Sequence, residues 1–273
     1  ALDATPTERA LSYAGKLFSP APFAVTKHTA TEVTRHVSEW LGAKRFDVAI
    51  CDFLAASLNF PTQHATPTVL FQHNVESSLW QRQAKYDPNL IKRLVFMLEA
   101  AKMTSYETRT VARFDHVIAV SEVDKKLMSS MTDPARISVV PTGVDVDQYQ
   151  QAAGPSATEP RVLFLGSMDW EANIDGVDYF CRESWPKIKA AVPDATFSIV
   201  GRNPPPRIQR LAAPDIEVTG WVASTIEPLR AAAVFVVPLR IGGGTRLKIY
   251  EAMAMRKAVV STTIGAEGLD VTD

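Results

Sequence analysis

Short runs of β-branched and aromatic residues alternate with longer helical stretches along the chain, from about residue 46 to its end. Examples of the apolar runs are FDVAICDFL, TVLFQHNV, RVLFLGSM and VFVVPL. This alternation is typical of repeated βαβ units, in which successive strands run parallel and helices connect them. The sequence therefore predicts an α/β fold with doubly wound parallel sheets.

Two series of these units are separated by a segment of different composition. Residues 150–160 (QQAAGPSATEP) contain small and polar residues and two prolines but no large apolar side chain, which is typical of a linker. We therefore predict two domains, residues 1–150 and 151–273, which fits a length of 273 residues at roughly 150 residues per domain. Two doubly wound domains in tandem predict a cleft between them, with ligands at the carboxyl ends of the strands.

The expected strands are residues 46–54, 68–75, 114–121, 137–140, 161–168, 196–201, 216–222, 234–239 and 258–262. Helices are expected at 78–113, with an interruption near Asp87 and Pro88, and at 122–131, 173–191, 224–232 and 245–255. The first half then offers four strands, and residues 1–45 indicate mainly helix and loop. We expect the chain to be an internal piece of a longer protein, truncated in both domains and inactive by itself.

The composition excludes several functional classes. The 29 Lys and Arg residues against 30 Asp and Glu give a formal charge of -1, so no basic field marks a nucleic-acid binder. No apolar run approaches the roughly 20 residues of a membrane-spanning helix, and the N-terminus lacks the pattern of a signal peptide. The two cysteines, Cys51 and Cys181, lie far apart without the spacing of metal ligands. With 46% hydrophobic residues, the sequence predicts a cytoplasmic globular protein.

The strongest local feature is the segment at residues 241–255, IGGGTRLKIYEAMAM. Three consecutive glycines follow an apolar strand and precede a helix, so backbone N–H groups at the helix N-terminus can approach an anion. Arg246 and Lys248 in the first turn oppose the helix dipole, and a phosphate bound there would offset that cost. The alternative interpretation is a flexible turn with solvated basic side chains. Neither a Walker loop nor a GxGxxG motif occurs in the chain.

This segment, GGGTRLKIYEAMA followed by KAVVSTTIGAEGL, resembles the donor-binding segment of GT-B-fold glycosyltransferases of family 4. RVLFLGSMDWEANIDGVDYF resembles the first strand and helix of that family's donor domain, and FSIVGR, IEVTGWV and VFVVPLRIGGGT resemble its next strands. FQHNVES, HVIAVSE and ISVVPTGVD resemble the acceptor domain and the crossover into the hinge. The resemblance covers most of the chain from about residue 46 and implies a GT-B fold, with two Rossmann-like domains that face a cleft.

The resemblance implies a hexosyltransferase-type glycosyltransferase (EC 2.4), which moves a sugar from a nucleotide-diphosphate donor to an acceptor hydroxyl with retention, in polysaccharide or glycolipid biosynthesis. It implies a nucleotide sugar and a saccharide or lipid-linked saccharide as partners, and no nucleic acid, cofactor or metal. Two alternatives stay open: a nucleotide-sugar epimerase on the same architecture, and a non-catalytic nucleotide-sugar-binding fragment. The lack of GxGxxG disfavours a nicotinamide-dependent oxidoreductase.

Position by position, the resemblance assigns Glu251 to the donor ribose, whose two hydroxyls a carboxylate can bind at once. The family's first paired glutamate falls at position 243, where this chain has Gly243, so we expect backbone amides of residues 242–245 to replace it. Arg202 and the turn at residues 220–222 match positions that line the nucleotide base. The expected donor-binding residues are Gly166, Arg202, Gly220, Trp221, Val222, Gly242, Gly243, Gly244, Thr245 and Glu251.

On the acceptor side, His73 ends an apolar run and resembles the family's histidine that reaches the transferred sugar. Without the resemblance, a lone histidine in such a place is more often structural. We expect His73 to be catalytic together with Arg246 and Lys248, which would stabilise the leaving diphosphate. Asn74 and Glu76 are expected beside the acceptor.

The DVD string at residues 145–147 has the form of a metal-binding motif from a different glycosyltransferase fold. It follows PTG, where the resemblance places the hinge, so we interpret it as helix-cap chemistry and expect no metal. A second departure lies where the donor helix ends, because Arg256 occupies the place of the usual glycine. A non-glycine residue in a left-handed cap costs on the order of 1 kcal/mol.

Several basic residues lie on the long helical stretch of the first half. A solvated helix face is the favoured interpretation, and peripheral contact with the inner face of an anionic membrane that bears a lipid-linked acceptor is the alternative. The residues are Arg82, Lys85, Lys92, Arg93 and Lys102.

Overall fold

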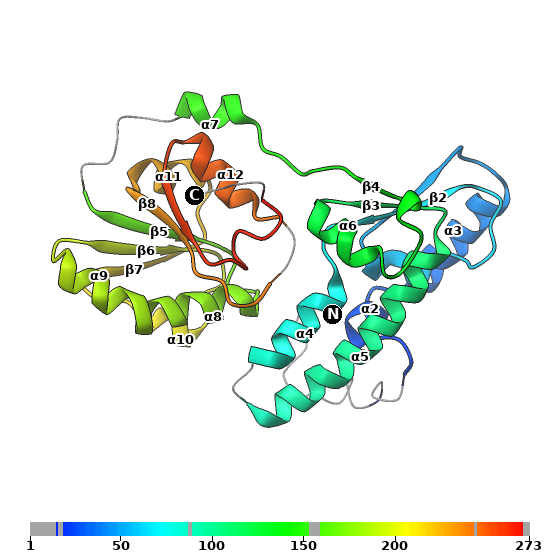
Figure 1. Cartoon of the computed structure of the whole chain (residues 1–273), viewed down its shortest axis with the longest axis horizontal. Coiled ribbons are helices and arrows are strands. Elements are labelled where there is room, and N and C mark those ends of the chain that lie inside the picture. Colours follow the sequence, from blue (N-terminus) through cyan, green and yellow to red (C-terminus); the bar gives the residue numbers. More distant parts are fainter. Residues whose placement is uncertain (1–14, 16–18, 87–88, 153–158, 243–244, 270–273) are drawn as a thin grey trace. The chain divides into compact units, whose positions relative to one another are not determined.

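The computed structural model describes residue 15 and residues 19–86, 89–152, 159–242 and 245–269. The chain divides into two compact units, Ala1–Pro141 and Thr142–Asp273 (Figure 1). The division expected from the sequence lies further along the chain, between residues 150 and 151. Helix α7 (Val146–Ala152) spans that position and packs on helices of the second unit.

The first unit is built on four parallel strands in the order β1-β2-β3-β4. They are β1 (Ala49–Asp52), β2 (Thr68–Gln72), β3 (His116–Ala119) and β4 (Ile137–Val139). Its helices are α2 (Phe23–Thr26), α3 (Thr31–Gly42), the 3₁₀ helix η1 (Leu54–Asn59), α4 (Glu76–Tyr86), α5 (Leu90–Arg113) and α6 (Glu122–Met128). All four strands expected in this half are present, each shorter than its apolar run. Because the strands are parallel, their carboxyl ends lie at one edge of the sheet.

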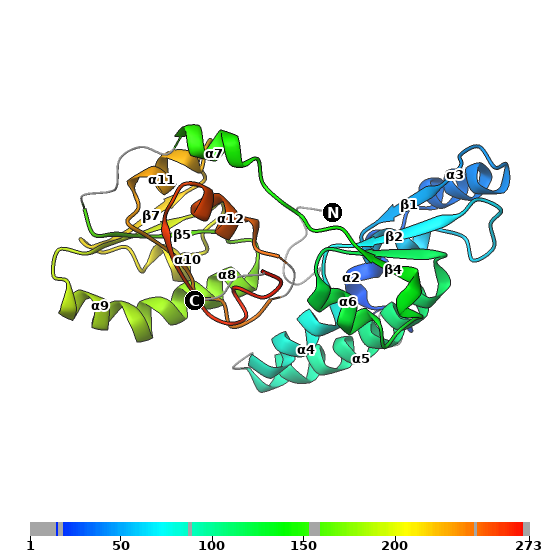
Figure 2. The same cartoon turned by 45° about the horizontal axis from the view of Figure 1, so that its top comes forward.

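Helices α4 and α5 form a hairpin that projects beyond the sheet of the first unit (Figures 1 and 2). The sequence predicted an interruption of one long helical stretch near Asp87 and Pro88. These two residues lie outside the described ones, and α4 ends before them and α5 begins after them. The side chain of Asn89 caps α5 by accepting the N–H groups of Ile91 and Lys92.

The start of α4 is capped by a carboxylate from α5. Glu107 is fully buried, and its two oxygens accept the backbone N–H groups of Glu76 and Ser77 at 2.8 and 2.9 Å. Gln72 at the end of β2 donates a third hydrogen bond to it. A negative charge at the positive end of the helix dipole, fully hydrogen-bonded, offsets the cost of its burial. Glu107 therefore fixes the hairpin to the end of β2.

The second unit has five parallel strands in the order β7-β6-β5-β8-β9. They are β5 (Arg161–Leu165), β6 (Thr196–Val200), β7 (Ile216–Gly220), β8 (Val234–Val237) and β9 (Ala258–Ser261). Its helices are α7, α8 (Glu171–Tyr179), α9 (Trp185–Ala191), α10 (Pro206–Gln209), α11 (Ile226–Ala231) and α12 (Leu247–Ala254), with a π-helical turn (Phe180–Ser184) joining α8 and α9. Helices α8 and α9 cover one face of the sheet, and α7, α11 and α12 cover the other (Figures 1 and 2).

The middle strands of this sheet are buried on both faces. In β5, β6 and β8 every residue after the first is buried, whereas the edge strands β7 and β9 contain no buried residue. Continuous apolar strands are what a parallel sheet covered by helices on both sides requires. The predicted α/β class, with two Rossmann-like parallel units, is confirmed.

The end of α12 has the backbone geometry that the sequence implied. Arg256 has a φ of 58°, in the left-handed region. Its N–H donates to the carbonyl of Met253 at 2.8 Å, and the N–H of Lys257 donates to the carbonyl of Ala252 at 2.9 Å. These two bonds are the Schellman pattern, in which glycine is the preferred residue at the left-handed position.

We predict that Arg256→Gly stabilises the second unit by about 1 kcal/mol, because glycine relieves the left-handed strain of a residue with a Cβ. The matched control is Arg210→Gly at the end of α10, where φ is -68° and glycine only adds freedom to the unfolded chain. Urea denaturation measures both. A lower free energy of unfolding for Arg256→Gly would contradict the prediction.

Candidate functional site

The strand order of the second unit reverses at β5, which has β6 on one side and β8 on the other. In open α/β sheets the loops that follow such strands separate and leave a crevice for ligands at the carboxyl edge. Here these are the loop from β5 to α8 and the loop from β8 to α12. The candidate donor site is built from them and from the loops that follow β6 and β7.

Trp170 and Arg246 connect the two central loops. The guanidinium carbon of Arg246 lies 4.8 Å from the centre of the Trp170 ring, which is a cation–π contact. Gly242 has a φ of 143°, and a Cβ at this position would collide with the guanidinium group and reach 3.4 Å from Trp170. Glycine at position 242 therefore leaves room for the contact between Arg246 and Trp170.

Helix α12 begins at Leu247, so Arg246 is its N-cap residue and only Lys248 lies in the first turn. The Lys248 ammonium lies 2.9 Å from both carboxylate oxygens of Glu251, one turn further on. Both cations that the sequence placed against the helix dipole thus have a partner within the chain, Trp170 for Arg246 and Glu251 for Lys248. The dipole mismatch by itself is therefore no evidence of an anion.

Glu251 is 7% exposed and links α12 to the start of α11. Besides Lys248 on its own helix, it receives a hydrogen bond from Thr225 at the start of α11 at 3.4 Å. The phenol of Tyr149 on α7 lies near it, and burial, and next the charge of Glu251, raise the pKa of Tyr149 above its usual value. A carboxylate has about four acceptor positions, and Lys248 and Thr225 occupy part of them.

Arg202 follows β6 and is tied to the loop after β5. Its guanidinium lies 2.8 Å from the carboxylate of Asp169 and donates to the hydroxyl of Ser167 at 3.0 Å. Asn203 also donates to Asp169, and this bond is the main reason that the pKa of Asp169 lies below its usual value. The backbone at Gly201 runs so close to the carbonyl of Gly166 that a Cβ on Gly201 would overlap it.

The expected donor residues that the structure describes lie at or after the carboxyl ends of β5, β6, β7 and β8. Trp221 after β7 is 71% exposed, and Gly220, which ends β7, has a φ of 78°. Gly243 and Gly244 lie outside the described residues. The other expected donor residues are Gly166, Arg202, Val222, Gly242, Thr245 and Glu251. Arg246 and Lys248, which were expected to be catalytic, also follow β8.

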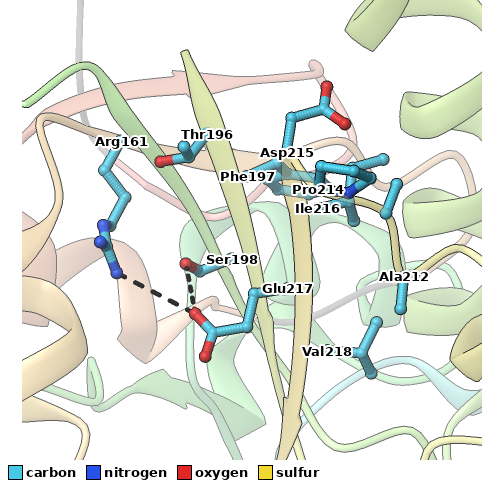
Figure 3. A pocket seen from close by; sticks show the side chains of 11 residues that line it. Arg161, Thr196, Phe197, Ser198, Ala212, Pro214, Asp215, Ile216, Glu217 and Val218 are labelled. Carbon is cyan, nitrogen blue, oxygen red and sulfur yellow. Dashed lines mark hydrogen bonds and ion pairs between the residues drawn. The ribbon is translucent and has the colours of Figure 1, made fainter. Parts of the chain in front are cut away.

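A hollow of about 410 Å³ lies at the opposite edge of the same sheet (Figure 3). Arg161 and Thr196 begin β5 and β6, and Asp215 directly precedes β7, so these lining residues mark the amino ends of the strands. Arg161 lies 4.0 Å from the carboxylate of Glu217, to which Ser198 also donates (Figure 3). None of the residues expected to bind the donor lines this hollow.

In the first unit, His73 follows β2 and pairs with a residue that the sequence analysis missed. Its Nε2 lies 2.7 Å from Oδ1 of Asp52, the last residue of β1. Because an ionised carboxylate only accepts hydrogen bonds, Nε2 carries the proton, and Nδ1 of the neutral ring is left as an acceptor. The only available signal is that Asp52 ends one strand and His73 directly follows the adjacent parallel strand, whose register aligns Asp52 with Phe71.

Two phenylalanines hold the His73 ring. The ring of Phe53 stacks on it with 4.0 Å between centroids and 21° between planes, and Phe71 lies at 4.5 Å. Phe53 has a φ of 67°, which costs a residue with a side chain roughly 1–2 kcal/mol. Strain of this kind persists only where the surroundings hold it, and it is frequent at functional sites.

Asn74 and Glu76 follow His73 in the loop and at the start of α4. Glu76 lines a hollow of about 180 Å³ together with Lys27, His28 and apolar side chains of α2, η1 and α5. Burial, and next the neighbouring charge of Glu107, raise the pKa of Glu76 to about 7. This carboxyl is therefore partly protonated at neutral pH, and it can either donate or accept a hydrogen bond.

Metal and thiol chemistry have little support among the residues that the structure describes. No group of three or more His, Cys, Asp or Glu side chains in this part of the chain is arranged to hold a metal ion. Asp145 of the DVD string accepts the N–H of Gln148 at 3.1 Å at the start of α7, which confirms its interpretation as a helix cap. Burial raises the pKa of both Cys51 and Cys181 to about 12, so neither thiol is a nucleophile at neutral pH.

The two halves of the chain match different family models, and the boundary between the matches lies further along the chain than the boundary between the two units. Residues 13–148 match the model described as "Glycosyltransferase Family 4", and residues 159–272 match the model described as "Glycosyl transferases group 1". Among curated proteins, the chain is 23% identical over 239 residues to an uncharacterised 44.6 kDa protein in the cps region of Klebsiella pneumoniae. This match covers 82% of the chain and 59% of the relative.

Solved structures of similar fold include a glycosyltransferase from Rickettsia africae and a trehalose 6-phosphate synthase. A variant of S. aureus TarM in complex with fondaparinux, α-GlcNAc-glycerol and UDP has a TM-score of 0.66 at 15% identity, covering 88% of this chain and 46% of that one. Anabaena HepE in complex with UDP-glucose has a TM-score of 0.58 at 16% identity, covering 88% and 64%. The synthase from Burkholderia multivorans has a TM-score of 0.60 at 13% identity, covering 96% and 64%. The chain thus spans about half to two thirds of the lengths of these proteins.

We predict that Glu76→Gln stabilises the first unit at pH 8 and has little effect near pH 4. The pKa of Glu76 is about 7 in the folded state and 4.5 in the unfolded chain, so the folded state holds this proton more tightly. As the pH rises from 4.5 to 7, the free energy of unfolding therefore falls. Glutamine stays neutral and escapes this loss, on the order of 2 kcal/mol at pH 8. Urea denaturation at the two pH values measures it, with Glu32→Gln on the exposed surface of α3 as control. Equal effects of Glu76→Gln at both pH values would contradict the raised pKa.

Proposed function

We propose that the chain, whose two halves match glycosyltransferase family models, transfers a sugar from a nucleotide-diphosphate donor to an acceptor hydroxyl with retention and without a metal. The observation that carries the donor assignment is the cluster at the strand-order reversal. Arg246 lies against Trp170, and Lys248 and Glu251 lie within the first two turns of α12. This places two cations and unpaired helix N–H groups together at the carboxyl edge of the second unit.

The diphosphate of the donor would lie at the N-terminus of α12. Lys248 is 42% exposed at its side chain and needs only a rotation to turn from Glu251 to a phosphate oxygen. Glu251 would then accept the ribose hydroxyls in place of the hydroxyl of Thr225. The same buried carboxylate would thus be satisfied with and without donor, by different partners.

The reaction needs charge stabilisation where the donor breaks. The bond from the anomeric carbon to the diphosphate oxygen breaks while the acceptor hydroxyl approaches the same face of the sugar, and the acceptor proton passes to the leaving phosphate. Negative charge grows on that phosphate, so preorganised donors directed at it lower the barrier. Arg246, Lys248 and the N–H groups of α12 would supply this field, which is the work that a metal does in other enzymes.

His73 would bind the transferred sugar from the acceptor unit. Asp52 fixes its ring and leaves Nδ1 as the acceptor for a sugar hydroxyl, while Asn74 and Glu76 would contact the acceptor molecule. HepE was solved with UDP-glucose, and TarM with UDP and saccharides, which supports a nucleotide sugar and a saccharide as partners here. The cps-region relative supports polysaccharide biosynthesis as the setting.

We predict that Lys248 contributes to diphosphate binding but not to nucleoside binding. Lys248→Met alone would leave the buried carboxylate of Glu251 without its cation. We therefore compare the double variant, Lys248→Met with Glu251→Gln, with the single variant Glu251→Gln. The added loss of Lys248 should weaken the preferred nucleoside diphosphate about tenfold, as expected for a charged hydrogen bond. The affinity for the parent nucleoside should not change.

Calorimetric titration measures both ligands, and Lys187→Met on the exposed surface of α9 serves as the control. An equal loss for the nucleoside and the diphosphate would show that Lys248 acts on the fold and not on the phosphates. No loss for either would place the diphosphate elsewhere.

The function itself is tested by product analysis. A thermal-shift screen selects the nucleotide sugar, since a ligand at 100 times its dissociation constant adds about 2.7 kcal/mol of stability. With that donor and a panel of saccharides, we expect acceptor-dependent release of the nucleoside diphosphate, a product that keeps the anomeric configuration of the donor by NMR, and no loss of rate in EDTA. A new nucleotide sugar formed without an acceptor would favour an epimerase, and inverted configuration or dependence on manganese would overturn the mechanism.

A further inference from the structure

Five large apolar side chains lie exposed on the first turns of α5. The exposed fractions of Leu90, Ile91, Leu94, Met97 and Leu98 are 72, 75, 67, 57 and 42%. Positions 90, 94, 97 and 98 have the spacing of one helix face. We call these five residues the apolar stripe. A contiguous exposed apolar stripe marks an interaction surface.

The stripe lies on the side of α5 opposite to the one that packs into the unit. Glu99, Met103 and Tyr106 are buried, and at 100° per residue they fall about half a turn away from the centre of the stripe. Further along the stripe face, the chain has Ser105 and Arg109, which are exposed and polar. The apolar surface is therefore confined to the end of the hairpin that projects beyond the sheet (Figures 1 and 2).

Basic side chains surround this end of the hairpin. Lys85, Lys92 and Arg93 are exposed, and none of them forms an ion pair with a carboxylate in the part of the chain that the structure describes. From residue 81 to residue 98 the sequence has four Lys and Arg residues and one Asp. The tip of the hairpin thus combines an apolar stripe with uncompensated positive charge.

A groove runs along the hairpin next to the stripe. It has a volume of about 410 Å³ and is lined by Gln81, Ala84, Lys85, Arg93, Met97, Ala100, Ala101 and Thr104, from both α4 and α5. Its base is formed by small and apolar side chains, and Lys85 and Arg93 supply its positive charges. An acyl chain fits the apolar base, and a phosphate fits the two cations.

From this arrangement we propose that the end of the α4–α5 hairpin binds an anionic phospholipid surface. The stripe would enter the boundary between headgroups and acyl chains, and Lys85, Lys92 and Arg93 would reach the lipid phosphates. A second copy of the chain is the weaker candidate, because two stripes that meet would bring cations of the same sign together. No helix in the described residues is long and apolar enough to cross a membrane. The proposal is independent of the donor chemistry.

Flotation of the full chain with vesicles tests this inference. Vesicles of phosphatidylcholine alone are compared with vesicles that also contain phosphatidylglycerol. Two variants remove the apolar stripe and the positive charge separately. The stripe variant carries Leu90→Asn, Leu94→Asn and Met97→Asn. The charge variant carries Lys92→Gln and Arg93→Gln. Helix α6 of the same unit supplies a control for each variant. Val123→Asn with Leu127→Asn is the control for the stripe, because these side chains are also exposed, at 41 and 39%. Lys125→Gln with Lys126→Gln is the control for the charge.

We expect the chain to float with the anionic vesicles and not with the neutral ones, and binding to weaken as salt is raised. Each α5 variant should lower the partition coefficient about tenfold or more, and the α6 variants should leave it unchanged. Absence of binding to anionic vesicles, or equal binding by all variants, would overturn the proposal. So would a concentration-dependent dimer in sedimentation velocity that the stripe variant abolishes, since the stripe would then belong to a second copy.

Discussion

The placement of the candidate donor site depends on one topological constraint, the reversal of strand order at β5. Because all five strands of the second unit are parallel, the loops that follow β5, β6, β7 and β8 share one edge of the sheet. The reversal separates the loops after β5 and β8, and Trp170 and Arg246 meet across that gap. Trp170 and Arg246, which are more than 70 positions apart in the sequence, thus form one surface at the start of α12.

Buried carboxylates then fix the helices around both candidate sites. Glu107 holds the start of α4 through two backbone N–H groups, and Glu251 links α12 to the start of α11 through the hydroxyl of Thr225. Neither carboxylate is isolated, because removal from water is offset by several donors at hydrogen-bond distance. The two differ in what surrounds them. Glu107 binds two backbone N–H groups besides the side chain of Gln72, whereas Glu251 binds the side chains of Lys248 and Thr225, which can rotate. Such partners suit a group proposed to exchange them for a ligand.

The fold could be predicted from the sequence because its signals are local. Apolar runs of β-branched residues gave the nine strands that the structure describes, and the break between α4 and α5 followed from Asp87 and Pro88. The short helices α2, α7 and α10 were not located, since four to seven residues carry too little periodicity. The partners of the site residues were also missed. Asp52 beside His73 and Trp170 beside Arg246 are long-range contacts, and no spacing rule predicts them.

The exposed stripe on α5 shows a different limit of the sequence. Apolar residues at helical spacing normally indicate the buried face, and only the structure shows that Glu99, Met103 and Tyr106 are buried while Leu90 and Leu94 are exposed. The sequence analysis weighed the basic residues alone and favoured a solvated helix face. With the apolar stripe beside them, the alternative of a membrane surface becomes the proposal.

The central claim is that the donor diphosphate binds at the carboxyl edge of the second unit, and the five tryptophans of the chain allow a direct test. With 5-fluorotryptophan incorporated, ¹⁹F NMR follows each indole as the preferred nucleoside diphosphate is added. The account predicts that Trp170 and Trp221 shift, and that Trp40 and Trp80 of the first unit do not. Trp185 donates to Asp215, which lines the hollow at the amino edge, so it reports on that alternative place. A shift of Trp185 with Trp170 and Trp221 unchanged would contradict the account.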